Sequence, residues 1–248
     1  MDFAFLEKKL CKFIQDELEN TCLKGVVLGL SGGIDSALVA TLCKKALGEK
    51  VFVLLMPSQF SNKANLKDAL KLCEDLKLEH KIINIENILK VFLQNIENPN
   101  KIRIGNLSAR IRMSLLYDYS AFKNALVVGT SNKSELMLGY GTIYGDLACA
   151  FNPIARLYKS EIFKFAKFLG LDEVFIKKAP SADLYEGQSD EGELGFSYEQ
   201  IDEALKALEA NDKSILTRLD PKLLEMIEKR KRQNAFKLEL PRFISLDE

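Results

Sequence analysis

A six-residue segment, Ser31-Gly32-Gly33-Ile34-Asp35-Ser36, constrains the fold of this chain more than any other feature. It lies between Val26–Leu30, an apolar run that predicts a buried strand, and Ala37–Leu47, which predicts a helix. A glycine turn at this place directs backbone N–H groups and the positive end of the helix dipole toward an anion. Two glycines also let the main chain approach phosphate oxygens closely. The segment therefore predicts an α/β fold with a phosphate site after the first strand.

The polar side chains of this segment add to the phosphate site. Ser31 and Ser36 supply hydroxyl donors. Asp35 would repel a phosphate unless a cation lay between them, and Mg²⁺ prefers one or two carboxylates together with phosphate oxygens. We therefore interpret Asp35 as a Mg²⁺ ligand. The alternative is an ordinary glycine turn in which Asp35 or Ser36 caps the helix. The segment lacks the G-x-x-x-x-G-K-[ST] pattern, so it is not a Walker-type loop.

Strand-like and helix-like segments alternate along the rest of the chain. This pattern predicts an open, doubly wound parallel sheet of about five strands with helices on both faces. Further strands are expected at Val51–Leu55, Lys81–Ile85 and Ala125–Val128. Helices are expected at 3–19, 62–76, 86–96, 106–122, 160–169, 197–209 and 221–236, with a loop over 139–153. No interdomain linker or repeat is evident, so residues 1–248 are expected to form one domain.

Composition excludes several classes of function. The 35 basic residues balance the 35 acidic ones, so no overall field favours nucleic acid. No apolar run reaches the roughly 20 residues that cross a membrane, and no signal peptide is evident, so a cytoplasmic protein is expected. The five cysteines form no C-x-x-C pair, which gives a disulfide framework or zinc site little support. His80, the only histidine, is expected to be structural, so Ser-His-Asp chemistry is excluded.

The six-residue segment resembles the pyrophosphate loop of the N-type ATP pyrophosphatases, which share an adenine nucleotide α-hydrolase-like fold. Further segments resemble motifs of one branch of that superfamily, the ammonia-dependent NAD synthetases. These segments follow in order at Gly105–Met113, Val128–Glu135, Gly139–Asp146, Pro153–Lys159, Pro180–Leu184 and Gln188–Gly195, and Lys237 and Pro241 match a weaker motif near the C-terminus.

This resemblance implies an activity. A member of the family adenylates the nicotinate carboxylate of deamido-NAD with MgATP and releases pyrophosphate. Ammonia then displaces AMP from the acyl-adenylate to give NAD. A glutaminase domain of more than 150 residues is expected where glutamine supplies the nitrogen, and this chain has no room for one. The resemblance also implies a homodimer whose interface builds the dinucleotide site.

The resemblance and the residue chemistry together assign the candidate site. Asp35, Glu135 and Lys159 are the predicted catalytic residues; the two carboxylates bind Mg²⁺ and the ammonium stabilises charge on the phosphates. A helix first-turn glutamate and a surface lysine are the alternatives for Glu135 and Lys159. The predicted ATP-binding residues are Gly29, Leu30, Ser31, Gly32, Gly33, Ile34, Asp35, Ser36, Thr130, Lys159 and Ser181. The predicted deamido-NAD-binding residues are Arg110, Tyr140, Tyr144, Asp146 and Lys237.

Arg110 and Arg112 stand two positions apart on a predicted helix, about 200° around its axis. Both cannot face one ligand, so one is expected to bind the ligand and the other to form a structural pair. The resemblance selects Arg110 for the dinucleotide, and Tyr140 can stack on the pyridine ring. Two positions depart from the family pattern, because Ile143 replaces a lysine and Ala150 an aspartate.

Two other functions remain open from the sequence. One is a tRNA-modifying member of the superfamily, which the neutral net charge and the absence of a catalytic cysteine pair disfavour. The other is a non-catalytic nucleotide-binding module, which Asp35, Glu135 and Lys159 disfavour. The glycine-rich and acidic segment 180–195 is predicted to close as a lid over both substrates, because a closed lid would keep water from the adenylate.

Overall fold

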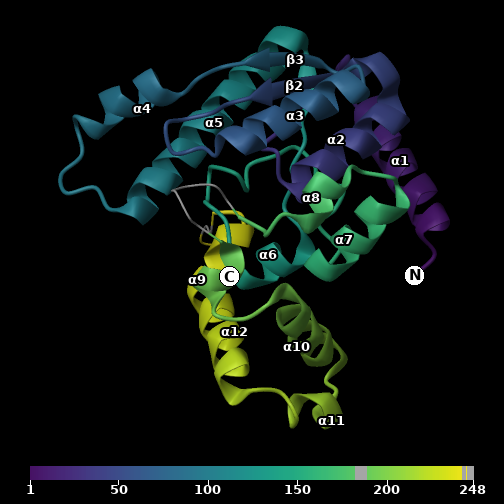
Figure 1. Cartoon of the computed structure of the whole chain (residues 1–248), viewed down its shortest axis with the longest axis vertical. Coiled ribbons are helices and arrows are strands. Elements are labelled where there is room, and N and C mark those ends of the chain that lie inside the picture. Colours follow the sequence, from purple (N-terminus) through teal and green to yellow (C-terminus); the bar gives the residue numbers. More distant parts are fainter. Residues whose placement is uncertain (182–188, 242–243, 245–248) are drawn as a thin grey trace.

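A parallel sheet forms the centre of the fold in the computed structural model, which describes residues 1–181, 189–241 and 244 (Figure 1). In these residues the sheet has four strands in the order β3-β2-β1-β4. The central strand β1 (Gly25–Gly29) pairs with β2 (Val51–Leu55) and with β4 (Ala125–Val127), and β3 (Glu79–Ile82) lies at the edge. A strand order that places the first strand inside the sheet is typical of doubly wound folds.

The predicted α/β fold, with a parallel sheet between helices, is confirmed, and the described residues form four strands where about five were expected. Beyond β4 the sheet continues only as one parallel bridge between Val128 and Phe151. Apart from this bridge, residues 139–153 form neither helix nor strand, as predicted for the loop. The chain therefore reaches the position of a fifth strand but leaves it after one residue.

Helices cover both faces of the sheet. Side chains alternate along β1, so Val26 and Leu28 pack into one apolar cluster and Val27 into another. The first cluster joins the sheet to α1 (Phe3–Glu19), α2 (Ile34–Leu47), α3 (Lys63–Asp75), α7 (Lys159–Phe168) and α8 (Glu173–Lys177). The second cluster joins it to α4 (Glu86–Leu93) and α5 (Lys101–Lys123). Asn62 caps α3 as predicted, since its side chain accepts from the Ala64 N–H at 2.9 Å.

A separate group of helices packs beside the sheet layers (Figure 1). It contains α6 (Lys133–Leu138), α9 (Asp190–Leu194), α10 (Tyr198–Ala210), α11 (Lys213–Leu216), α12 (Pro221–Asn234) and the 3₁₀ turn η2 (Ala235–Leu238). A third apolar cluster around Ile201, Leu205 and Ile227 holds α6, α9, α10 and α12 together. The short 3₁₀ turn η1 (Gly48–Lys50) links α2 to β2. Among the described residues, none of these helices combines the length and apolarity that a membrane span requires.

Candidate active site

A cavity of about 520 Å³ opens where β1, β2 and β4 end. Open α/β sheets place ligands at this edge, beside the point where the strand order reverses. Four parts of the chain contribute to its wall: the predicted phosphate loop (Ser31–Ser36), the first turns of α5, the loop 139–146 and the helix α12. Segments separated by more than 100 residues therefore meet around one space.

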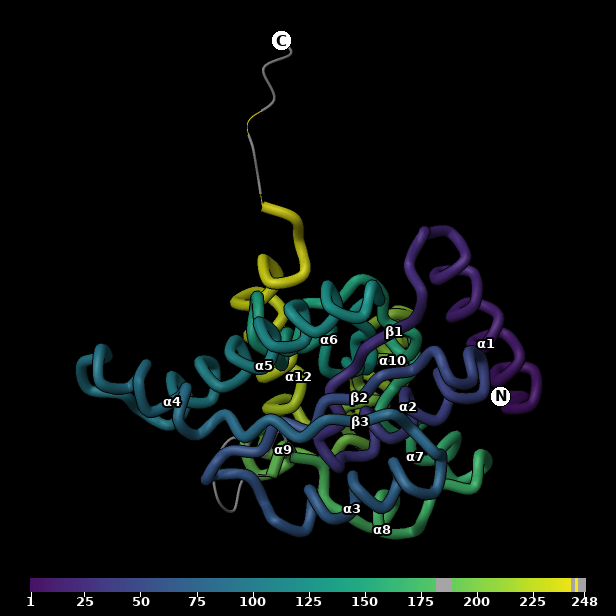
Figure 2. Tube along the Cα trace, turned by 90° about the horizontal axis from the view of Figure 1, so that it is seen from above, coloured from purple at the N-terminus to yellow at the C-terminus, as the bar shows by residue number. Residues whose placement is uncertain are grey.

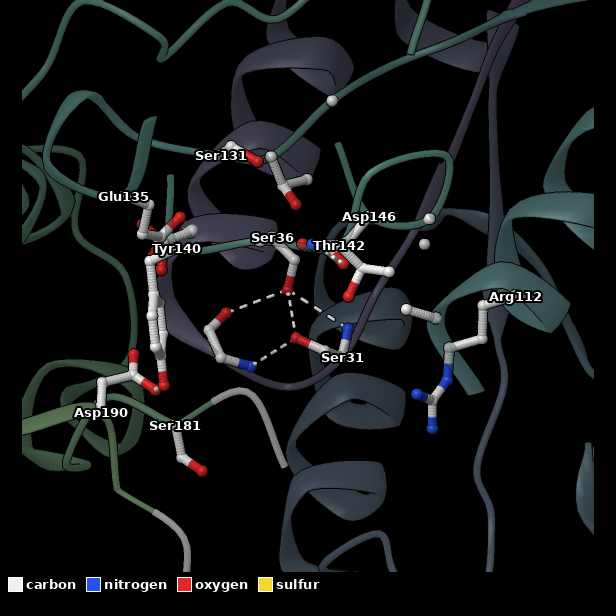
Figure 3. A pocket seen from close by; sticks show the side chains of 18 of the residues that line it. Ser31, Ser36, Arg112, Ser131, Glu135, Tyr140, Thr142, Asp146, Ser181 and Asp190 are labelled. Atoms are coloured by element: carbon white, nitrogen blue, oxygen red, sulfur yellow. Dashed lines mark hydrogen bonds between the residues drawn. The ribbon is translucent and has the colours of Figure 1, made fainter. Parts of the chain in front are cut away.

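The phosphate loop has the conformation that its sequence predicts. Helix α2 begins at Ile34, with Gly33 as its N-cap and no side chain capping it. The Ser31 N–H donates to Ser36 Oγ at 3.2 Å, and the Gly33 N–H donates to Ser31 Oγ at 3.2 Å (Figure 3). Because neither Asp35 nor Ser36 caps α2, the alternative of a plain capped turn does not describe this segment.

Position 32 requires a glycine for two reasons, its backbone conformation and the atoms around it. Its φ of +83° lies in the left-handed region that disfavours residues with a Cβ. A Cβ at this position would stand 2.2 Å from the carbonyl oxygen of Asn65, in α3. The phosphate loop is thus in direct contact with α3, and that contact leaves no room for a methyl group.

The three predicted catalytic residues meet in this structure. Lys159 Nζ lies 2.6 Å from Asp35 Oδ2 and 3.1 Å from Glu135 Oε1. The Asn132 amide donates to Asp35 Oδ1 at 2.9 Å and accepts from the Glu135 N–H at 3.0 Å. These contacts join the phosphate loop to the start of α6 and the start of α7.

These three charged side chains are mostly buried. The Lys159 side chain is 3% exposed, and those of Asp35 and Glu135 are 17% and 16% exposed. Burial lowers the pKa of Lys159, but the charges of Asp35 and Glu135 raise it by more, so the ammonium stays protonated. Burial also raises the pKa of Glu135, against the lowering effect of Lys159. A permanent positive charge therefore stands beside the phosphate loop.

A buried aspartate on α10 fixes the helix that carries Lys159. Asp202, 2% exposed, accepts from the Ser160 N–H at 2.7 Å and from the Ser134 hydroxyl. Ser134 in turn accepts from the Lys159 N–H at 2.9 Å. The first turn of α7 is thus held by α6 and α10 together.

Aromatic and acidic residues gather on the Glu135 side of the cavity (Figure 3). The Tyr140 hydroxyl donates to Glu193 at 2.6 Å and to Asp190 at 3.3 Å, and burial raises its pKa. Tyr198 places its ring 5.2 Å from Lys159 Nζ. Asp190 begins α9, within the predicted lid 180–195; residues 182–188 of that segment lie outside the described residues.

The predicted nucleotide residues mostly line the cavity. The cavity is lined by Thr130, Ser181, Gly29, Leu30 and every residue of the phosphate loop but Gly32. Gly32 instead contacts α3. The half-buried Lys178 was not predicted. It lines the cavity and donates to the Gly32 carbonyl at 3.0 Å and to Asp68 at 2.5 Å.

The predicted dinucleotide residues divide into two groups. Tyr140, Asp146 and Lys237 line the cavity, and Lys237 donates to the carbonyls of Gly139 and Gly141 at 2.9 and 3.0 Å. Arg110 and Tyr144 are exposed outside the cavity wall of this single chain, so their assignment stays a prediction.

The two α5 arginines diverge as their spacing requires. Arg110 Nε donates to the Ile143 carbonyl at 3.3 Å on the outer side. Arg112 lines the cavity, opposite Tyr140 and Glu135 in Figure 3, and its Nε donates to the Met56 carbonyl at 2.9 Å. Sequence reasoning did not place Arg112 in the cavity.

The donor set fits a magnesium ion shared with a phosphate ligand. In the described ranges no group of three or more His, Cys, Asp and Glu side chains can hold a metal ion. Asp35 and Glu135 are hard oxygen donors that already converge on one cation, the Lys159 ammonium. Two carboxylates suit Mg²⁺, which completes its octahedron with water and phosphate oxygens.

Comparison with known proteins gives one family. The sequence model of the NAD synthase family matches residues 6–241. The NH(3)-dependent NAD(+) synthetase of Campylobacter jejuni is 65% identical over 246 residues, covering 99% of this chain and 100% of the relative. The Helicobacter pylori protein of the same name is 46% identical, covering 97% of this chain and 95% of the relative.

Two solved structures share the fold over almost their whole length. The NH3-dependent NAD synthetase of C. jejuni, in complex with the nitrate ion, has a TM-score of 0.89 at 60% identity, with 99% of this chain and 100% of that chain covered. The NMN synthetase of Francisella tularensis has a TM-score of 0.91 at 34% identity, with the same coverage.

Proposed function

Because this chain belongs to the NAD synthase family, we propose that it amidates deamido-NAD with ammonia in a reaction driven by ATP. The enzyme is then a ligase that forms a C–N bond and releases AMP and pyrophosphate. One observation carries the proposal. Asp35, Glu135 and Lys159 come from three separate motifs, and both carboxylates lie within 3.1 Å of the Lys159 ammonium beside the phosphate loop.

The chemistry needs positioned charge rather than a nucleophilic side chain. The nicotinate carboxylate attacks the α-phosphorus of ATP and pyrophosphate leaves, which turns the carboxylate oxygen into part of a good leaving group. Ammonia then adds to the acyl carbon, loses a proton, and AMP departs. The phosphate loop binds the triphosphate, and Lys159 neutralises negative charge that grows on the phosphates as pyrophosphate leaves.

We propose Mg²⁺ as the metal cofactor, held by Asp35 and Glu135. The support is the paired, mostly buried carboxylates and their place beside the phosphate loop. When bound, the ion neutralises triphosphate charge. Chelation of divalent metal should abolish product formation, and Mg²⁺ should restore it.

We further propose a homodimer. Large apolar side chains are exposed along α4 and α5, which extend from the body on the side away from α1 (Figure 2). They include Val91 (59%), Ile102 (70%) and Phe122 (76% exposed). Such a surface suits a second copy of the chain, and the outward Arg110 would then contribute to a dinucleotide site between copies. Light scattering coupled to size exclusion should give twice the chain mass, and Phe122→Asp should shift the mass toward one chain.

A cytoplasmic location is part of the proposal. All five cysteines are free thiols, which is typical of a reducing compartment. ATP as co-substrate is consistent with that location. Fractionation of cells that produce the protein should recover it with cytoplasmic markers.

The F. tularensis structure raises a second candidate substrate, the nicotinate mononucleotide, because that relative is named an NMN synthetase. Purified protein with ATP, Mg²⁺ and ammonium should convert the dinucleotide faster than the mononucleotide. AMP should form in equal amount to NAD. Faster amidation of the mononucleotide would overturn the substrate assignment, and formation of ADP matching the amide would overturn the reaction class.

A further inference from the structure

Arg230 is a cation in the cavity wall for which the described residues supply no anionic partner. Arg230 lies on α12, is half-buried and lines the cavity. Within the part of the chain that the structure describes, no carboxylate pairs with its guanidinium. Its contact is with the Tyr140 ring, whose centroid lies 5.5 Å from Arg230 Cζ.

Three lysines that line the cavity differ from Arg230, because each has a partner within the chain. Lys159 is paired with two carboxylates and Lys178 with Asp68. Lys237 donates to two backbone carbonyl oxygens. Arg230 therefore stands apart as a cavity cation whose donors are left for a ligand.

Helix α12 holds Arg230 in this position through contacts on its next turns. The Asn234 amide donates to the Leu138 carbonyl at 3.4 Å, and an added Cβ on Gly139 would stand 2.2 Å from Asn234 Cβ. Lys237 bonds to the backbone on both sides of Tyr140. The arginine and the tyrosine are thus positioned by one tightly packed junction.

The charge of Arg230 is permanent and acts within the cavity. A guanidinium does not lose its proton in proteins, and partial burial removes hydration that another ligand must replace. Burial lowers the pKa of Lys237, Asp146 raises it, and the charge of Arg230 lowers it further. The planar fork of an arginine matches a carboxylate or phosphate with two parallel hydrogen bonds.

We infer that Arg230 binds an oxyanion of the pyridine-bearing substrate beside Tyr140, and so helps to determine which acid the enzyme activates. This inference rests on the proposed function. The triphosphate of ATP already has the phosphate loop and Lys159, so the anion at Arg230 belongs to the second substrate. That anion is either the nicotinate carboxylate or a dinucleotide phosphate.

The test compares Arg230→Gln with Arg232→Gln, a matched change at an exposed arginine of the same helix. Equilibrium binding of deamido-NAD and of NAD is measured by calorimetry, together with the KM of each substrate. Arg230→Gln should weaken deamido-NAD binding about 10- to 100-fold, the range for a lost charged hydrogen bond. The KM for ATP should stay within about twofold, and Arg232→Gln should change neither value.

The amide product separates the two sources of the anion, since NAD lacks the carboxylate but keeps both phosphates. Weakened binding of deamido-NAD alone assigns the carboxylate, and equal weakening of both assigns a phosphate. Arg230→Lys should restore part of the affinity, because it keeps the charge without the fork. Unchanged dinucleotide binding in Arg230→Gln, or a loss confined to ATP, overturns the inference. A wild-type protein that binds deamido-NAD but forms no NAD overturns the proposed function instead.

Discussion

The two sides of the cavity are built differently. On the phosphate-loop side, Asp35, Glu135 and Lys159 are mostly buried, and both carboxylates contact the Lys159 ammonium. On the α12 side, Arg230 has no carboxylate partner among the described residues and contacts the Tyr140 ring. The first side is held together by contacts within one chain, whereas in our proposal the second side is completed by the dinucleotide and a second subunit.

Because of this difference, a substitution should affect both folding stability and enzyme activity on one side of the cavity but not on the other. A buried polar network is costly to break, because each group left unpaired has lost its water. Substitutions on the phosphate-loop side should therefore damage both the fold and the reaction. Substitutions on the α12 side should change the handling of one substrate and leave the fold intact.

The largest effect is expected for Lys159→Met. Two mostly buried carboxylates would then lack their countercharge, so unfolding should need about 3–5 kcal/mol less free energy, the usual result of breaking a buried pair. Turnover should fall at least about 1,000-fold. Urea denaturation and a steady-state NAD assay measure the two effects. Lys164→Met on the exposed face of α7 is the control; equal stability of the two variants would show that the pairing is unimportant for the fold.

Asp35→Asn should separate charge from shape. The amide is isosteric, so the variant should fold, but the loss of a charge at the proposed metal site should lower kcat about 100- to 1,000-fold. Titration with Mg²⁺ checks the cause. Wild-type turnover at saturating Mg²⁺ would show that Asp35 serves only the structure of the loop.

Gly32→Ala tests the contact between the phosphate loop and α3. Gly170 provides a matched control, because its φ of +75° is also positive but a Cβ added there would meet no neighbouring atom within 4 Å. Both variants carry backbone strain of about 1 kcal/mol. Only Gly32→Ala should also raise the KM for ATP, by about tenfold, because the clash with Asn65 moves the loop. Equal ATP kinetics in the two variants would contradict the contact argument.

The smallest effect is expected for Asp202→Asn. An amide offers one oxygen where the carboxylate offers two, so either Ser134 or Ser160 loses its acceptor. The start of α7 should shift slightly, which should lower kcat about tenfold and leave the KM for ATP within about twofold. Glu203→Gln, at the exposed neighbouring position, is the control. A change in stability without a change in kcat would make Asp202 a purely structural residue.

Local patterns explain why much of the fold was predictable from the sequence. The turn between a first strand and a helix at Ser31–Gly33 and the bounds of α1 and β2 were confirmed, because contiguous residues carry their signals. Strand β3 was displaced: Lys81–Ile85 was predicted and Glu79–Ile82 is observed. All four residues of this edge strand are exposed, so no buried alternation marks its start. The apolar signal came from residues beyond the strand, where Ile85 packs beneath α4 and α5.

The candidate site was predictable only where a motif carried it. Lys159 reaches Asp35 across 124 positions, and the motifs named both residues. Asp202 and Lys178 are single polar residues that meet the site from elsewhere in the chain, across 42 and 146 positions. A lone aspartate or lysine on a helix has no pattern that distinguishes a buried tether from a solvated charge. The packing of α10 beside α7, and of α8 against the sheet, decides between these roles.

The hydrogen bonds that Asp202 accepts from Ser134 and Ser160 can form only late during synthesis of the chain. All four strands precede Lys159 in the sequence, so the sheet and the phosphate loop can form first. Asp202 follows Lys159 by 202 − 159 = 43 residues, which a ribosome adds in about 2–9 s. During that interval the nascent chain carries Lys159, the proposed catalytic lysine, without the aspartate that fixes the start of α7. Nascent chains arrested before α10 should accordingly resist protease in the sheet while remaining inactive, so the enzyme gains its activity as a late step of its own translation.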